Sequence, residues 1–149
     1  MSAALTLATP DHMVRLAPLV AAFHDEEGID STEESREAAL APLLEGIPHG
    51  CVYLIGPARA PIGYIVITFT WSLEYGGLDA MIDELFIRPP VRGRGIATEV
   101  LISLPGALAA GGLKAIHLEV AHDNKAAKSL YHRAGFAPKE DYLLMTRKL

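Results

Sequence analysis

The residues with the clearest capacity for chemistry form a short run of arginine and glycine, Arg92-Gly-Arg-Gly-Ile-Ala97. The run follows the apolar segment Ile82 to Ile87, which is typical of a strand, and it leads into residues with helical spacing. A helix start leaves about four N–H groups unpaired and carries roughly half a positive charge, so that phosphate groups bind there. The two glycines would let an anion approach the backbone closely, and the two arginines add positive charge. The pattern predicts a loop that binds a phosphorylated ligand.

Two other phosphate-binding motifs do not fit this run. The dinucleotide fingerprint Gly-x-Gly-x-x-Gly would need a third glycine where Thr98 stands, and a Walker loop would need Gly-Lys followed by Ser or Thr. A plain turn between a strand and a helix, with incidental glycines, is the structural alternative. Six residues alone do not exclude it.

A second group of candidate residues lies on a predicted helix from Asn124 to Ala134. Asn124, Ala127 and Tyr131 are spaced i, i+3 and i+7, so they share one face of that helix. Tyr131 has two interpretations, a core tyrosine whose hydroxyl is satisfied or a proton donor in the wall of a site.

Asp83 and Glu84 are adjacent carboxylates within the predicted strand. Neighbouring residues of a strand point to opposite faces of a sheet, so we expect one carboxylate to face a cleft and the other to face away. Either could act as a general base. The alternative for each is an ion pair with an arginine or a bound water.

These segments together resemble the GNAT superfamily of N-acetyltransferases. The resemblance includes the strand, Pro89 and the Arg92–Ala97 run, and it continues with Asn124, Ala127, Leu130-Tyr131 and Gly135-Phe136 at the spacing of the family's second motif. The segment Tyr142 to Arg147 is similar to the family's last strand. The specific motifs span about Ile82 to Phe136, whereas the N-terminal half agrees only in the order of its elements.

The resemblance implies that acetyl-CoA is the co-substrate. No metal is expected, because the histidines show no metal-ligand spacing. Tyr131 would be the general acid for the leaving thiolate, the N–H of Leu85 would stabilise the oxyanion, and Asp83, Glu84 or a relayed water would be the base. The family's pattern assigns coenzyme A binding to Leu85, Phe86, Ile87, Arg92, Gly93, Arg94, Gly95, Ile96, Ala97, Asn124, Ala127 and Tyr131.

The activity that the resemblance implies is transfer of an acetyl group to a primary amine, expected to be a small molecule. Two alternatives remain at this stage: acetylation of a protein or peptide, and a coenzyme-A-binding regulatory domain without catalysis. Homodimers are common in the family.

The elements that must position these residues are predicted in the order ααβββαβαβ after a short first strand. The helices begin near Thr9, Ser31, Gly93 and Asn124, and Pro105 should kink or end the third. The expected strands are Leu5–Ala8, Cys51–Ile55, Ile62–Trp71, Ala80–Ile87, Ala115–Ala121 and Tyr142–Arg147. The fold class is α/β and of the GNAT type, a mixed central sheet flanked by helices, with 80–87 and 115–121 as parallel neighbours that splay apart. Residues 1–149 are expected to form a single domain.

Composition supports a soluble, cytoplasmic protein. The net charge of −5 argues against nucleic-acid binding, and no stretch is apolar for the ~20 residues that a membrane span needs. A single cysteine, Cys51, cannot form an internal disulfide, and no basic and apolar leader marks secretion. The six histidines form no pair with metal-ligand spacing, and each is expected to be structural or exposed.

Acidic residues are concentrated between Asp25 and Glu45. Eight of the eighteen acids lie in this stretch of twenty-one residues. One interpretation is a solvated helix face with its loop. The other is a negative rim that attracts cationic substrates such as amines.

Overall fold

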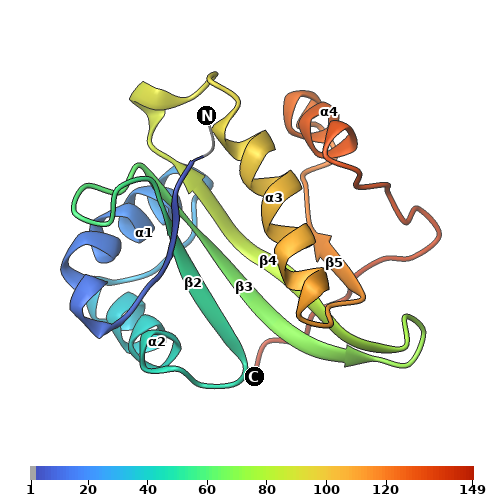
Figure 1. Ribbon diagram of the computed structural model, residues 1–149, viewed down its shortest axis with the longest axis horizontal. Helices are drawn as coiled ribbons and strands as arrows, with labels where there is room; N and C mark the ends of the chain where they lie inside the picture. Colours follow the sequence, from blue (N-terminus) through green and yellow to red (C-terminus); the bar gives the residue numbers. More distant parts are fainter. Residues whose placement is uncertain (1–2) are drawn as a thin grey trace.

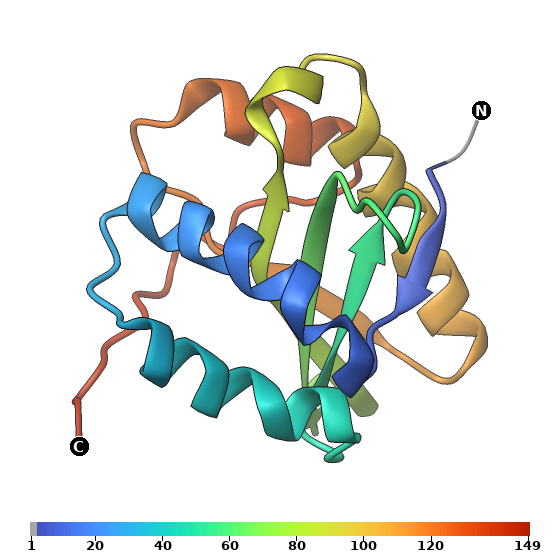
Figure 2. The ribbon, with the colours of Figure 1, turned by 90° about the vertical axis from the view of Figure 1, so that its left-hand side faces the viewer.

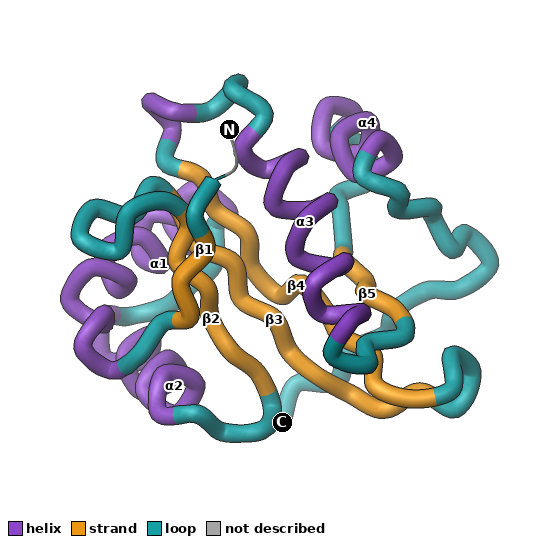
Figure 3. The backbone as a smooth tube through the Cα atoms, in the orientation of Figure 1, coloured by secondary structure: helices purple, strands orange, loops and turns teal. Residues whose placement is uncertain are grey.

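A computed structural model describes residues 3–149 as one sheet with helices on both faces (Figure 1). The strands lie in the order β1-β2-β3-β4-β5, as the tube in Figure 3 shows most clearly. The first four are antiparallel to their neighbours, and β4 and β5 are parallel, as predicted. Their bounds are β1 Leu5–Leu7, β2 Gly50–Ile55, β3 Gly63–Ser72, β4 Gly77–Ile87 and β5 Ala115–Leu118.

Two helices cover each face of the sheet. Helices α1 (Met13–Glu27) and α2 (Glu33–Glu45) lie together on one face, which is turned toward the viewer in Figure 2. Helices α3 (Ile96–Ala110) and α4 (Lys125–Arg133) lie on the other. Short 3-10 turns at Pro10–His12 and Pro89–Val91 precede α1 and follow β4. The predicted α/β architecture, a mixed central sheet flanked by helices, is confirmed.

Side chains along the central strands point alternately to the two faces of the sheet, and this divides the core into two layers. In β2 and β3, Leu54 and Val66 pack under α1 and α2, whereas Ile65 and Ile67 pack under α3. Each of these side chains is almost completely buried, and full burial of such a side chain contributes roughly 1.5–3 kcal/mol. The sheet is therefore a rigid support for the ends of its strands.

The pairing of β4 is asymmetric along its length. On the β5 side, pairing runs only from Asp79↔Ala115 to Ile82↔Leu118. On the β3 side, pairing continues to Ile87↔Gly63. The stretch 83–87 thus has one edge without a strand partner, and this opening is where the candidate site forms.

The predicted elements differ from the structure in two details. Helix α3 does not end at Pro105, which was one of the two outcomes expected there, but runs through it to Ala110, because burial of Leu101 and Leu104 against the sheet outweighs the loss of one backbone hydrogen bond. Strand β5 stops at Leu118, three residues before its predicted end.

The predicted last strand, Tyr142 to Arg147, is not formed. Its residues have no regular secondary structure, and Leu143 and Met145 are largely exposed to solvent. A strand needs hydrogen-bond partners for its N–H and C=O groups, and this segment pairs with none of the five strands. Among the described residues, no helix is both long enough and apolar enough to cross a membrane.

Candidate active site

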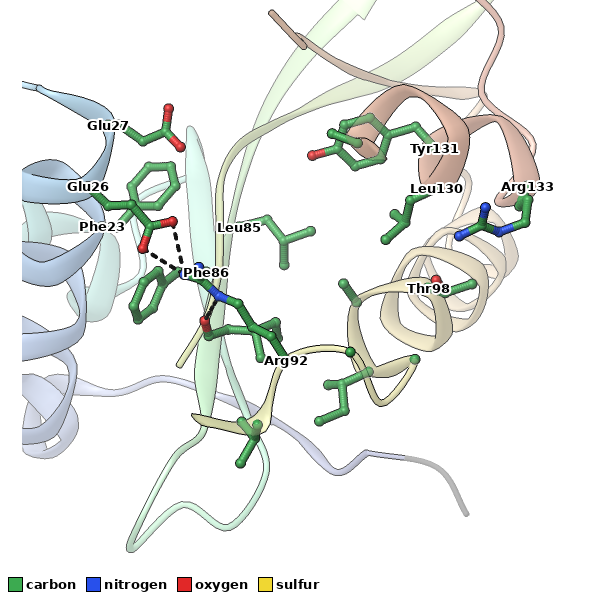
Figure 4. Close-up of a pocket in the computed structure, with 17 residues that line it drawn as sticks. Phe23, Glu26, Glu27, Leu85, Phe86, Arg92, Thr98, Leu130, Tyr131 and Arg133 are labelled. Atoms are coloured by element: carbon green, nitrogen blue, oxygen red, sulfur yellow. Dashed lines mark hydrogen bonds and ion pairs between the residues drawn. The ribbon is translucent and has the colours of Figure 1, made fainter. Parts of the chain in front are cut away.

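A cavity of about 490 Å³ lies at the opening beside β4 (Figure 4). Its walls come from the end of α1, the last residues of β4, the loop before α3 and the inner side of α4. The predicted residues that line it are Leu85, Phe86, Ile87, Arg92, Gly93, Gly95, Ile96, Ala97, Ala127 and Tyr131. Segments more than forty residues apart in sequence thus meet around one space.

The loop before α3 has the geometry of an anion-binding site. Gly93 and Gly95 have φ angles of 77° and 78°, in the left-handed region where glycine is strongly favoured. Helix α3 begins at Ile96, so the N–H groups of its first three residues have no carbonyl of a preceding helical turn to bind, whereas the Glu99 N–H already binds the Gly95 carbonyl. Apart from each glycine and its two chain neighbours, no protein atom lies within 4 Å of where a Cβ on either glycine would stand. Phosphate oxygens could therefore reach the backbone.

Arg92 crosses the mouth of the cavity. Its Nε donates to the carbonyl oxygen of Ile87 at 2.8 Å, and its Nη2 forms an ion pair with Glu26 of α1 at 2.7 Å (Figure 4). The guanidinium also lies over the ring of Phe86, with its Cζ 5.4 Å from the ring centre. The arginine therefore links α1 to the end of β4.

Tyr131 projects from α4 with its hydroxyl directed into the cavity (Figure 4). Its ring packs edge-on against Phe136, 6.3 Å between centroids. Burial raises the pKa of the Tyr131 hydroxyl above its ordinary value of 10.0, and the nearby negative charge of Glu27 raises it further. The hydroxyl is therefore protonated at neutral pH and can act as a donor.

Asn124 and Arg94 do not line the cavity. The Asn124 side chain caps α4 by accepting a hydrogen bond from the N–H of Ala127 at 3.1 Å. Helix capping alone is enough to explain why an asparagine stands at this position. The contacts of Asn124 and Arg94 with coenzyme A stay predictions.

A β-bulge at Asp83 breaks the expected alternation of the two carboxylates. Val66 of β3 pairs with Glu84, and the next residue, Ile67, pairs with Ile82, which leaves Asp83 as the extra residue. Both carboxylate residues border the same small cavity of about 90 Å³, between β4 and helices α1 and α2. The prediction that they face opposite sides of the sheet is therefore wrong.

Glu84 is held by two hydrogen-bond partners. Its Oε2 lies 2.7 Å from Nε2 of His24 in α1, and its Oε1 accepts from the hydroxyl of Tyr64 at 2.8 Å. The His24 and Glu84 side chains are only 14% and 16% exposed. Burial and the charge of Glu84 raise the pKa of Tyr64 far above its usual range. Asp83, by contrast, is exposed.

The family model described as the acetyltransferase (GNAT) family matches residues 18–136, which is most of the chain. The chain belongs to the GNAT family. An uncharacterized N-acetyltransferase of Methanocaldococcus jannaschii is 32% identical over 81 residues, 54% of this chain and 36% of that protein. The match thus spans about a third of that relative's length.

Solved structures show the same GNAT fold. An integron cassette protein from the mobile metagenome of Cole Harbour Salt Marsh has 29% identity and a TM-score of 0.83, covering 97% of this chain and 90% of that chain. AAC(6')-Iy, in complex with the bisubstrate analogue CoA-S-monomethyl-acetylneamine, has 14% identity and a TM-score of 0.81, covering 100% and 99%. At that identity the likeness concerns the fold alone.

Several lining residues of this GNAT chain were not predicted from its sequence. They are Phe23, Glu26, Glu27, Val91, Thr98, Leu130 and Arg133. The two glutamates belong to the acidic stretch for which a cationic-substrate role was one interpretation. His24 was expected to be structural or exposed, and its contact with Glu84 depends on packing between α1 and β4 that no local pattern encodes. Residues 3–149 contain no group of three or more His, Cys, Asp or Glu side chains arranged to hold a metal ion.

Proposed function

We propose that this protein transfers the acetyl group of acetyl-CoA to a primary amine of a small molecule. The observation that carries the proposal is the convergence of three features on one cavity: the unpaired edge of β4, the glycine loop at the start of α3, and the Tyr131 hydroxyl. Membership of the GNAT family supports acetyl-CoA as the donor.

The described residues fit the parts of coenzyme A. The unpaired backbone between Leu85 and Ile87 can bond an extended pantetheine arm in the manner of a neighbouring strand. The N–H groups at the start of α3, together with Arg92, would bind the pyrophosphate. Arg92 would exchange its contact with Glu26 for phosphate oxygens, which are also acceptors of charge-assisted hydrogen bonds.

The chemical step is direct attack by the neutral amine on the thioester carbonyl. Deprotonating an alkyl amine of pKa ~10.4 at pH 7 costs roughly 4–5 kcal/mol, so a base is needed, and the bulge supplies carboxylates at Asp83 and Glu84. The Leu85 N–H would stabilise the developing oxyanion. As the carbon–sulfur bond breaks, the thiolate would take the proton of the Tyr131 hydroxyl.

The charge of the cavity favours a cationic acceptor. Glu26 and Glu27 of α1 line it opposite Tyr131, and both belong to the acidic stretch that continues toward α2. The bisubstrate analogue bound by AAC(6')-Iy joins coenzyme A to an amine-bearing compound. This precedent in the fold supports a small amine, such as an amino sugar or a polyamine, as the class to test first.

The test is release of free coenzyme A thiol from acetyl-CoA with a panel of amino sugars, polyamines and short lysine peptides. We expect release that depends on the amine and a product that gains one acetyl group by mass spectrometry. Turnover of the peptides alone would replace the small-molecule acceptor with a peptide. Calorimetric binding of coenzyme A without turnover of any acceptor would contradict the enzymatic function.

A further inference from the structure

A chain of four polar side chains runs from helix α2 to the end of β4. Arg36 of α2 donates from Nη1 to the Ser31 hydroxyl oxygen at 3.0 Å, and that oxygen lies 2.8 Å from Nδ1 of His24. Nε2 of His24 then meets Glu84 at 2.7 Å. At one end of this series, Arg36 can only donate hydrogen bonds. At the other end, Glu84 can only accept them when it is ionised.

The donors and acceptors of this chain allow two protonation states. In the first, Glu84 is ionised, His24 is neutral with its proton on Nε2, and the Ser31 hydroxyl donates to Nδ1. In the second, the pair holds one more proton, and His24 can donate from Nδ1 as well. A hydroxyl has one proton and two lone pairs, so Ser31 can rotate from donor to acceptor while Arg36 keeps its oxygen in place.

The position of the pair suits contact with an acceptor. Glu84 borders the small cavity at the bulge, and the next residue, Leu85, lines the large cavity where the thioester would lie. The carboxylate has about four lone-pair positions, of which His24 and Tyr64 use two. The other titratable groups bordering the small cavity are Arg36 from α2 and Asp83 from β4.

We propose that His24 and Glu84 act as one unit that accepts the acceptor's ammonium proton, with Ser31 and Arg36 as positioning residues. The inference rests on the proposed function and selects Glu84 over Asp83 as the base.

The proton balance of the reaction closes with this unit. The acceptor ammonium gives one proton to the pair, which later releases it to water. The amine nitrogen then bonds to the acetyl carbon, the carbon–sulfur bond breaks, and Tyr131 protonates the sulfur. After the attack the nitrogen loses its second proton to water, and Tyr131 regains a proton from water, so the net reaction releases one proton.

The test is the pH dependence of kcat in His24→Gln. Glutamine can still donate an amide N–H toward Glu84, but it cannot take up a proton. We expect kcat at pH 7 to fall about tenfold or more, and the deficit to shrink as the pH approaches the pKa of the amine, where the free base needs no proton acceptor. The deficit should also shrink with a weakly basic acceptor, while the KM for acetyl-CoA is unchanged.

A second histidine provides a matched control. His117 of β5 pairs with Asp79 near the other end of β4, at 3.1 Å, and His117→Gln should leave kcat unchanged at every pH. Ser31→Ala removes only the rotating hydroxyl, and it should give a smaller deficit that high pH also rescues. If His24→Gln has lost its fold and no longer binds coenzyme A, Ser31→Ala tests the proposal in its place.

Two results would overturn the inference while leaving the proposed function intact. One is an active wild-type enzyme whose His24→Gln and Ser31→Ala variants match it at pH 7. The other is a deficit of the same size at every pH and with every acceptor, since that pattern reports structural damage. Absence of thiol release by the wild-type protein with every amine would instead contradict the proposed function.

Discussion

The two ends of strand β4 carry similar side chains in different settings. Near its amino end, Asp79 is 8% exposed, accepts a hydrogen bond from Thr70 and pairs with His117, while the backbone is bonded to β3 and β5. Near its carboxyl end, Glu84 pairs with His24. There β4 no longer pairs with β5, and a bulge interrupts its pairing with β3.

The difference shows that a carboxylate–histidine pair does not by itself make a site. Both pairs join neighbouring elements, but the Glu84 pair borders the small cavity beside β4, and the next residue, Leu85, lines the large one. The backbone opening that follows Ile82 supplies what the Asp79 end lacks, namely N–H and C=O groups without a strand partner and room for a ligand. Substitutions at the two ends should therefore separate loss of activity from loss of stability.

The largest effect on activity is expected from Tyr131→Phe at the open end. The variant keeps the ring against Phe136 and loses only the hydroxyl, so kcat should fall about 100-fold or more while the KM for acetyl-CoA stays the same. Because the pKa of Tyr131 is raised above 10.0, the wild-type enzyme should show no alkaline loss of activity from this group below that pH. Steady-state kinetics over a pH series measures both quantities.

A smaller effect is expected when Arg92 is replaced by alanine. Loss of a charge-assisted contact with phosphate should raise the KM for acetyl-CoA about tenfold, with little change in kcat. Arg94→Ala is the matched control, because Arg94 lies in the same loop but does not line the cavity. Equal effects of the two variants would mean that the loop attracts coenzyme A only by its overall charge.

At the closed end, Asp79→Asn should lower stability and leave turnover unchanged. The hydrogen bond from Thr70 is the main cause that holds the pKa of Asp79 below its ordinary value of 3.8, with a further contribution from His117. The ionised form therefore stabilises the fold above that value, and the benefit is lost as the pH falls through the lowered pKa. Urea unfolding should show a deficit of about 1 kcal/mol at pH 7 that narrows below pH ~4. A loss of turnover without a loss of stability would contradict the assignment of Asp79 to stability alone.

The smallest effect is expected from Glu26→Gln at the mouth of the open end. The pair with Arg92 is partly exposed, 41% and 42%, and such pairs contribute only about 0–1 kcal/mol. Releasing Arg92 and removing a negative charge near the phosphates should lower the Kd of coenzyme A by about two- to fivefold. Calorimetry at low and high salt measures this, and a weaker affinity would show that Glu26 helps to position Arg92 for the ligand.

Local patterns predicted much of the open end. The glycine run gave the loop before α3, and the helical spacing of Ala127 and Tyr131 placed both residues in the cavity wall. The parallel pairing of β4 and β5 also followed from the predicted order of elements. These features depend on residues close in sequence, or on a connection whose geometry is restricted.

Other features depend on contacts between distant segments, and the sequence did not reveal them. The bulge at Asp83 depends on the register between β3 and β4. A prediction from strict alternation along the strand therefore placed the two carboxylates on opposite faces of the sheet, which is wrong. The contact of His24 with Glu84 joins residues sixty positions apart. Pro105 indicated a kink or an end in α3, and packing carries the helix through it to Ala110. The segment Tyr142 to Arg147 has strand-like residues but pairs with none of the five strands.

The most direct test of the account is to measure amine-dependent thiol release from acetyl-CoA for wild type, Tyr131→Phe and Asp79→Asn in parallel. We expect equal kcat for wild type and Asp79→Asn, and for Tyr131→Phe a kcat that is lower by about 100-fold or more with unchanged binding of coenzyme A. A Tyr131→Phe enzyme as fast as wild type would contradict the claim that catalysis takes place at the open end of β4 with this hydroxyl as the proton donor.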